Sequence, residues 1–139
     1  MSSPSTAGYS GTPLPKKLGI SAGQRVCAID APRPYPEMVA PWPDGAQLVA
    51  AADGSTALVH LFVAERDKLA RWAKALRDTL PSTAVLWVSW PKKASKQPTD
   101  ITEDVIREIV LPMGWVDVKV CAVDATWSGL KLMVRKTLR

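Results

Sequence analysis

Two nearly continuous apolar runs occupy the middle of the chain, residues 57–63 (ALVHLFV) and 84–90 (AVLWVSW). Such runs, as opposed to alternating ones, are typical of strands covered on both faces, as in a mostly parallel sheet between helical layers. The segment between them, residues 65–80, brings apolar side chains onto one helical stripe: Leu69, Trp72, Ala73, Leu76 and Leu80. Because connections between parallel strands are right-handed, this stretch predicts one crossover unit of an α/β fold.

Further strands are predicted on both sides of this unit. Residues 25–30 (RVCAID) and 47–51 (QLVAA) indicate two strands before it, and the alternating residues 116–120 and 130–134 indicate a terminal β-hairpin after it. Only residues 52–56 separate the second strand from the third, whereas parallel crossovers normally need a dozen residues or more. We therefore expect the second strand to be short, antiparallel or displaced.

Two more helices complete the predicted elements. Residues 12–19 suit a short helix that Thr12 caps and Gly19 ends. Residues 101–111 suit a second one, which Asp100 and Glu103 begin in the manner of a capping box.

The chain has 139 residues, 47% of them apolar and 22% charged, a balance that suits one globular core. We expect residues 1–8 to form a short disordered tail and residues 9–139 to form a single domain. No apolar run reaches the roughly 18 to 20 residues of a membrane span, and the N-terminus lacks a secretory pattern. These features favour a cytoplasmic protein without a membrane partner, and the single histidine and two cysteines predict no metal site.

A sheet that closes with helix, strand, turn and antiparallel strand resembles the end of the class I methyltransferase fold. That resemblance implies a Rossmann-like sheet with the strand order second, first, third, fourth, sixth, fifth. On that order Cys27 and Cys121 lie four strands apart, about 19 Å, which is too far for a disulfide.

The chain also resembles a bacterial family, domain of unknown function 3052. The resemblance lies in five segments: YSGTPLPKKLGI (9–20), LVHLFV (58–63), LWVSWPKKAS (86–95), PTDITEDVIRE (98–108) and VDVKVCAVDATWSGLK (116–131). It implies the α/β fold and a bacterial cytosolic setting, and it implies no activity.

Methyltransferases of this fold bind S-adenosylmethionine beside glycines that follow the first strand. Here that strand is followed by residues 30–36 (DAPRPYP), whose three prolines lack backbone N–H donors, and no glycine comes before Gly45. No helix of useful length is expected between Pro36 and Pro41, so the helix dipole is missing too. Asp53 offers either a ribose contact or, as we favour, a plain Asp-Gly turn. The sequence therefore predicts no cofactor.

His60, the only histidine, lies within the third strand on the same face as Leu58 and Phe62. We interpret it first as a buried histidine with a hydrogen-bond partner. The functional alternative makes it a proton carrier that Asp30 orients at the end of the first strand. No serine or cysteine nucleophile is evident beside the pair, so no catalytic residue is assigned.

Lys92 and Lys93 follow Trp90-Pro91 at the carboxyl end of the fourth strand, where open α/β sheets bind ligands. One interpretation is a carboxylate or phosphate site with Trp90 as a stacking wall. The alternative, which we favour, has these lysines form salt bridges with the acids that begin the nearby helices.

Lys119, Lys131 and Arg135 form a basic strip on the hairpin, in a chain of net charge +5. We interpret it as a solvated edge strand protected by charge. Nucleic-acid binding is the alternative, which we disfavour because the strip has no interleaved exposed aromatic residues and no recognised module. Three functional hypotheses follow. The first is a non-catalytic domain that binds a small ligand or a protein partner, the second an S-adenosylmethionine-dependent methyltransferase with an atypical loop, and the third a basic nucleic-acid-binding protein.

Overall fold

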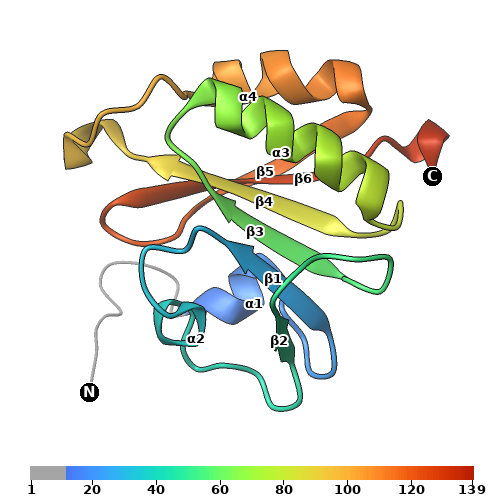
Figure 1. The fold of residues 1–139 in the computed structure, drawn as a ribbon. Helices are drawn as coiled ribbons and strands as arrows, with labels where there is room; N and C mark the ends of the chain where they lie inside the picture. Colours follow the sequence, from blue (N-terminus) through green and yellow to red (C-terminus); the bar gives the residue numbers. More distant parts are fainter. Residues whose placement is uncertain (1–11) are drawn as a thin grey trace.

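The computed structural model describes residues 12–139, so the tail predicted at residues 1–8 lies outside the described residues. Six strands form one sheet in the order β2-β1-β3-β4-β6-β5, as predicted (Figure 1). The strands are β1 (Arg25–Ile29), β2 (Gln47–Val49), β3 (Leu58–Phe62), β4 (Val85–Pro91), β5 (Trp115–Ala122) and β6 (Trp127–Val134). The α-helices are α1 (Leu14–Leu18), α2 (Tyr35–Met38), α3 (Arg66–Thr79) and α4 (Glu103–Val110), and the short 3₁₀ helices are η2 (Lys93–Ser95), η3 (Leu111–Met113) and η4 (Lys136–Leu138).

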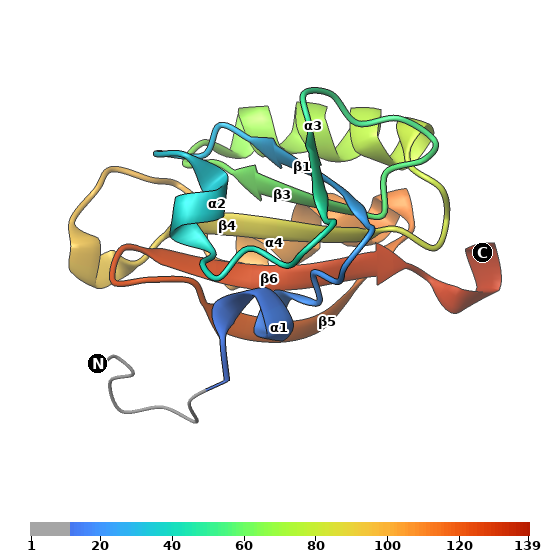
Figure 2. The same ribbon diagram turned by 90° about the horizontal axis from the view of Figure 1, so that it is seen from below.

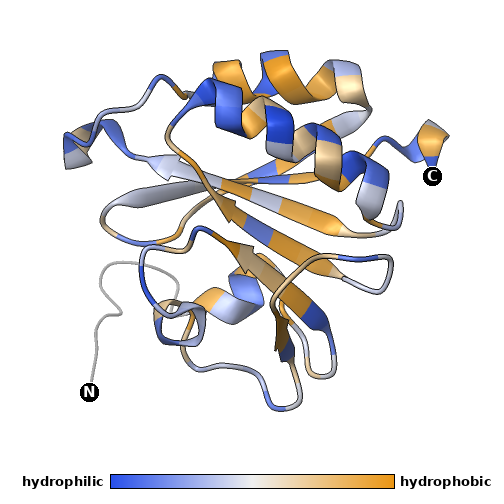
Figure 3. Ribbon diagram, viewed as in Figure 1, coloured by the Kyte–Doolittle hydropathy of each residue, from blue (hydrophilic) through white to orange (hydrophobic). Residues whose placement is uncertain are grey.

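The sheet is parallel from β2 to β4, and β6 runs antiparallel to both of its neighbours. All five residues of β3 are buried, as are six of the seven in β4. Figure 3 shows that these two strands are also among the most apolar of the sheet, apart from His60 and the residues near the end of β4. The continuous runs in the sequence therefore mark the two central strands, which are covered on both faces.

Helices cover the two faces separately, which gives three layers (Figures 1 and 2). α3 and α4 pack on one face over a core that includes Leu69, Leu76 and Ile106. α1 and α2 lie on the opposite face, where Leu18 and Tyr35 join a second core. The fold is thus the predicted Rossmann-like α/β sandwich, with an antiparallel hairpin at one end of the sheet.

The second strand meets the first of the three alternatives expected for it. β2 is short, with three residues, and it pairs in parallel with β1. Val49, its last residue, pairs with Cys27, while Leu58, the first residue of β3, pairs with Val26 on the other side of β1. Because β2 ends almost level with the start of β3, residues 50–57 need only cross β1, and a helix is not required.

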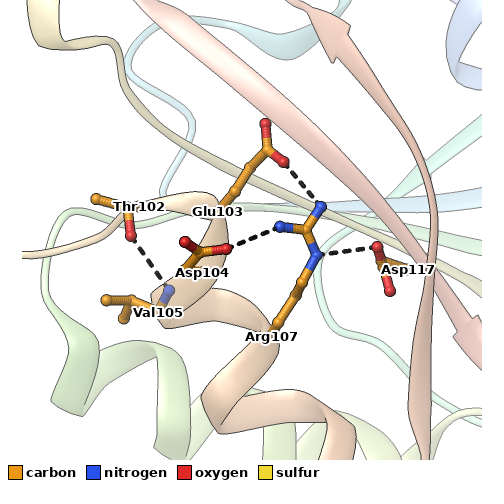
Figure 4. Close-up of polar contacts among 6 residues, drawn as sticks. All are labelled: Thr102, Glu103, Asp104, Val105, Arg107 and Asp117. Atoms are coloured by element: carbon orange, nitrogen blue, oxygen red, sulfur yellow. Dashed lines mark hydrogen bonds and ion pairs between the residues drawn. The ribbon is translucent and has the colours of Figure 1, made fainter.

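Helix starts also differ from the prediction. The Thr102 side chain, and not Asp100, caps α4 by accepting a hydrogen bond from the Val105 backbone N–H at 3.2 Å (Figure 4). Asp100 instead accepts from the Arg66 backbone N–H at 2.8 Å, at the start of α3. At α1 the N-cap position is occupied by Pro13, one residue after the predicted Thr12, and Gly19 ends the helix in the left-handed conformation, as predicted.

Arg107 fastens α4 to the hairpin. Its guanidinium contacts Glu103 at 2.8 Å and Asp104 at 3.2 Å on its own helix, and Asp117 of β5 at 3.0 Å (Figure 4). Hydrogen bonds to Asp117 and then to Glu103 raise the pKa of Arg107 above its ordinary value. The Asp117 side chain of β5 is therefore directed toward the face of the sheet that α4 covers.

Cys27 and Cys121 are both free, on strands four places apart in the sheet, as predicted. Within residues 12–139, no helix has the length and apolar character that crossing a membrane requires.

Candidate functional site

A buried chain of hydrogen bonds joins α2 to the two central strands. His60 of β3 lies with its Nδ1 2.6 Å from the Tyr35 hydroxyl and its Nε2 2.6 Å from the Ser89 hydroxyl of β4. His60 and Ser89 are fully buried and Tyr35 is 2% exposed. Both ring nitrogens therefore have partners inside the protein, one donating and one accepting.

Burial keeps this chain neutral. It lowers the pKa of His60 to about 3 and raises the pKa of Tyr35 above its ordinary value. The Phe62 ring stacks on the imidazole with 4.2 Å between centroids, and Trp127 packs edge-on against Phe62 at 5.3 Å. The imidazole is neutral and lies among aromatic rings. This agrees with the first interpretation of His60, a buried histidine with a hydrogen-bond partner.

The alternative in which Asp30 orients His60 is not what the structure shows. Asp30 is exposed just after β1 and has a positive φ of 57°. Tyr35 and Ser89 take both ring nitrogens, so Asp30 does not orient the imidazole. The sequence did not single out Tyr35 and Ser89 because each reaches His60 across a strand or from another element.

Residues 30–36 fit an adenosyl cofactor poorly. Three of the seven are prolines, and α2, which follows from Pro34, has only four residues. The side chain that this segment directs at the sheet is Tyr35, and it is already packed against His60, Phe62 and Trp42. The three prolines have no backbone N–H to offer a ligand here. The segment does not fit S-adenosylmethionine.

Asp53, the alternative ribose contact, belongs to a turn. Its carboxylate accepts hydrogen bonds from the Ser55 backbone N–H at 2.8 Å and the Ser55 hydroxyl at 2.6 Å. These bonds lower the pKa of Asp53. The favoured interpretation of Asp53 as a turn residue agrees with this geometry.

A cavity of about 420 Å³ lies between α1 and the β5–β6 turn. Figure 2 shows α1 beside this hairpin, on the face opposite α3 and α4. The residues that line the cavity are Thr12, Leu14, Lys17, Lys92, Ala122, Val123, Asp124 and Ala125. Its position is next to the carboxyl end of β4, where the sequence predicted ligand binding.

Lys92 is the predicted site residue that this cavity contains. The residue directly follows β4, and its backbone N–H donates to the Thr126 carbonyl at 2.7 Å. That bond ties the end of β4 to the β5–β6 turn. The base of the Lys92 side chain is therefore held at the rim of the cavity.

The acid in the cavity is already engaged. One oxygen of Asp124 accepts from the backbone N–H groups of Thr126 and Trp127, each at 2.8 Å, which shapes the turn. The other oxygen lies 3.5 Å from the Arg33 guanidinium, in the segment after β1. Asp124 is thus paired with Arg33, and two lysines, Lys17 and Lys92, line the same cavity.

Two other predicted residues do not join Lys92. Trp90 is 8% exposed and packs in the core beneath α3 and α4, so it is not a wall beside the lysines. Successive strand residues point to opposite faces, and Trp90 shares the face of Val88. Lys93 begins η2 and is exposed, outside the cavity lining.

The salt bridges expected between the lysines after β4 and the acids at the helix starts do not form. Glu103 and Asp104 bond to Arg107, and Asp100 accepts from the Arg66 backbone N–H. Lys92 lines the cavity. Among residues 12–139, no group of three metal-ligating side chains is suitably placed to hold an ion.

The sequence did not identify Lys17, Asp124 or Arg33 as site residues. They come from α1, the hairpin turn and the segment after β1, which are far apart in the chain. The motif WPKK at residues 90–93 contributes Lys92 to the cavity lining. Only the packing of α1 against the hairpin adds the remaining side chains.

No protein-family model matches the chain, and no curated protein matches it, so the resemblance to domain of unknown function 3052 is not confirmed. Solved structures do match. The chain is similar to a SAM-dependent methyltransferase from Aquifex aeolicus, at 15% identity over 86% of each chain with a TM-score of 0.63. It is also similar to a putative type 11 methyltransferase from Sulfolobus solfataricus, at 12% identity over 88% of this chain and 90% of that chain, with a TM-score of 0.61.

A third match is fibrillarin from Aeropyrum pernix, solved with natively bound S-adenosyl-L-methionine. Its identity is 11%, the alignment covers 81% of this chain and 67% of that chain, and the TM-score is 0.52. Identities this low establish the fold alone. The chain therefore has a methyltransferase-like, Rossmann-like fold.

Proposed function

We propose that this chain is a non-catalytic binding domain that holds a small anionic molecule in the cavity between α1 and the β5–β6 turn. The observation that carries the proposal is the position of Lys92, directly after β4, in the lining of a cavity whose acid, Asp124, is paired with Arg33. A volume of about 420 Å³ lies within the range of small-molecule sites, which runs from about 300 to 1,000 Å³.

The lining suggests the chemistry of the ligand. The ammonium group of Lys92 favours a carboxylate or a phosphate. Leu14 and Val123, with two alanines, offer apolar contact to the rest of the molecule. A small organic phosphate or carboxylate with an apolar portion combines these properties.

Titration calorimetry with inorganic phosphate, pyrophosphate and citrate tests the proposal directly. We expect at least one of these anions to bind, and Lys92→Ala to weaken that binding at least tenfold. The matched control is Lys93→Ala, which removes the same charge from the next residue, outside the cavity. The proposal fails if none of the three anions binds, or if the two variants weaken binding equally.

Methyl transfer from S-adenosylmethionine is the second candidate function. The likeness to methyltransferase structures favours it, and the prolines and the packed Tyr35 after β1 argue against it. A ligand at 100 times its dissociation constant adds about 2.7 kcal/mol to the stability of a protein. We expect millimolar S-adenosylmethionine to leave the thermal midpoint unchanged, and a clear rise would establish the second candidate in place of the first.

A further inference from the structure

The cavity between α1 and the β5–β6 turn is lined by charges of opposite sign. Lys92 contributes an ammonium group and Asp124 a carboxylate. The two residues come from neighbouring segments at the end of the β4–β6 ladder, where Pro91 pairs with Trp127. None of the ion pairs within residues 12–139 joins Lys92 to Asp124 or involves Lys92 at all. The cavity thus presents both charges to a ligand.

Backbone hydrogen bonds fix where these two residues lie relative to each other. The Lys92 backbone N–H donates to the Thr126 carbonyl at 2.7 Å, and the Thr126 backbone N–H donates to Oδ1 of Asp124 at 2.8 Å. The Trp127 backbone N–H donates to the same oxygen, also at 2.8 Å. Because the turn uses Oδ1, the carboxylate is held in one orientation, and Oδ2 is its remaining acceptor.

The ion pair with Arg33 does not saturate Oδ2. The Arg33 guanidinium lies 3.5 Å from this oxygen, whereas hydrogen bonds between charged groups measure about 2.7 to 2.9 Å. Half of the Arg33 side chain is exposed, and exposed ion pairs contribute little to stability. Arg33 therefore offsets part of the charge of Asp124, and among residues 12–139 no donor forms a hydrogen bond with Oδ2.

The two charges discriminate among small molecules. A simple anion is attracted by Lys92 but repelled by the carboxylate of Asp124, and a simple amine meets the reverse conflict. A molecule that carries both a carboxylate and an ammonium group satisfies both residues, and its ammonium supplies the N–H donors that Oδ2 lacks. Leu14 and Val123 line the same cavity and offer apolar contact to the rest of such a molecule.

We propose that the ligand of this cavity is an α-amino acid with an apolar side chain. Lys92 binds its carboxylate, and Oδ2 of Asp124 accepts a hydrogen bond from its ammonium group. The apolar side chain lies against Leu14 and Val123. This inference rests on the proposed function, because it takes Lys92 as the group that binds the anionic end of the ligand, and it adds a positive charge at the other group.

Titration calorimetry of the full chain at neutral pH, with three molecules of one carbon skeleton, tests the inference. Leucine carries both charged groups, isocaproate lacks the ammonium group, and isoamylamine lacks the carboxylate. We expect leucine to bind at least tenfold more tightly than either of the others. Equal binding of leucine and isocaproate would overturn the inference, and this comparison needs no variant.

Asp124→Asn isolates the contribution of the acid. The amide oxygen still accepts the two hydrogen bonds of the turn, while the charge and the acceptor at Oδ2 are lost. We expect this variant to bind leucine at least tenfold more weakly, and isocaproate equally well or more tightly, because a like charge has been removed. The matched control, Asp44→Asn, removes an exposed acid outside the cavity lining and leaves both affinities unchanged. Circular dichroism of each variant confirms that the fold is retained.

Two results with the variants would also overturn the inference: an equal loss of leucine and isocaproate binding in Asp124→Asn, or the same loss of leucine binding in Asp44→Asn. The proposed function is judged separately, by the titrations with phosphate, pyrophosphate and citrate and by Lys92→Ala. If those anions bind through Lys92 while leucine binds no more tightly than isocaproate, the cavity is a simple anion site and only the amino-acid inference fails. Absence of anion binding removes the proposed function itself.

Discussion

Tyr35 and His60 are joined by a hydrogen bond of 2.6 Å between the phenol hydroxyl and Nδ1, which fixes α2 on the central strand β3. The same bond places an aromatic ring where the segment after β1 meets the sheet. The packed Tyr35 ring, which makes the segment after β1 unsuited to a cofactor, therefore also holds that segment in place.

We expect Tyr35→Phe to lower the free energy of unfolding by about 1 to 3 kcal/mol, because the ring is kept while a buried nitrogen of His60 loses its partner. Ser89→Ala removes the other partner and has a cost of similar size. Urea unfolding measures both. In the double variant the two costs are not additive, because both act through one imidazole. Strict additivity would contradict a single connected chain.

His60 makes the protein sensitive to acid. Its pKa is about 3 in the folded protein and near 6.5 when unfolded, so between these values the unfolded state binds more protons. The stabilisation is complete above about pH 6.5 and is lost as the pH falls toward 3, by about 1.4 kcal/mol per pH unit. Urea unfolding at pH 7.5, 6, 5 and 4 measures the slope. We expect His60→Gln, which does not titrate, to give a flatter curve, and equal slopes would exclude His60 as the source.

Arg107→Ala should destabilise the protein more than Lys74→Ala does. Arg107 bonds to three acids and bridges α4 to β5, whereas Lys74 makes one exposed pair with Asp78 on its own helix. The comparison of urea midpoints for the two variants is the measurement. We also expect the difference to shrink in 1 M NaCl, because salt screens these partly exposed charges. A midpoint for Arg107→Ala equal to that of Lys74→Ala would show that the bridge to Asp117 contributes nothing.

Gly129→Ala tests the packing under the hairpin. A Cβ at this position would lie 3.2 Å from Trp87 Cε3 and 3.3 Å from Val123 Cγ2, so we expect a loss of about 1 to 3 kcal/mol from overpacking. Gly54→Ala is the control, since an added Cβ there meets nothing within 4 Å. Thermal melts of both variants give the comparison, and a stable Gly129→Ala protein would mean that Trp87 has room to shift.

The two thiols should differ in reactivity. Cys27 is 1% exposed in the sheet, and Cys121 is half-buried on the hairpin. Burial raises the pKa of both thiols, so neither is a ready nucleophile at neutral pH. With a chromogenic disulfide at pH 8 we expect one slow reaction in the folded protein, which Cys121→Ser removes. Loss of that reaction in Cys27→Ser instead would reverse the assignment.

The central strands and α3 could be predicted because the sequence pattern that indicates each of them lies within the element itself. The continuous apolar runs over residues 57–63 and 84–90 indicate strands that are buried on both faces, whichever strands lie beside them. The amphipathic stripe of α3 can likewise be recognised without knowing what the helix packs against. The orientation of β2 was not accessible in this way. It depends on where Val49 and Leu58 come level with β1, and that register is a property of the whole sheet.

The candidate site was predictable only at Lys92. The end of a strand is visible in the sequence, and ligands gather at strand ends in open α/β sheets. Trp90 was misplaced because the alternation of side chains within β4 was not followed to its last residues. Lys17 joins Lys92 only after the chain has folded α1 onto a hairpin some hundred residues later.

The short link over β1, residues 50–57, leaves β2 as the least secured part of the sheet. β2 has three paired residues and, among residues 12–139, no strand on its outer side, and the Leu48 side chain is about half exposed. In a native-state hydrogen-exchange experiment its amides would open first, well before those of β4, without unfolding of the remainder. We therefore expect reversible local unfolding of β2, the edge strand at the end of the sheet remote from the hairpin.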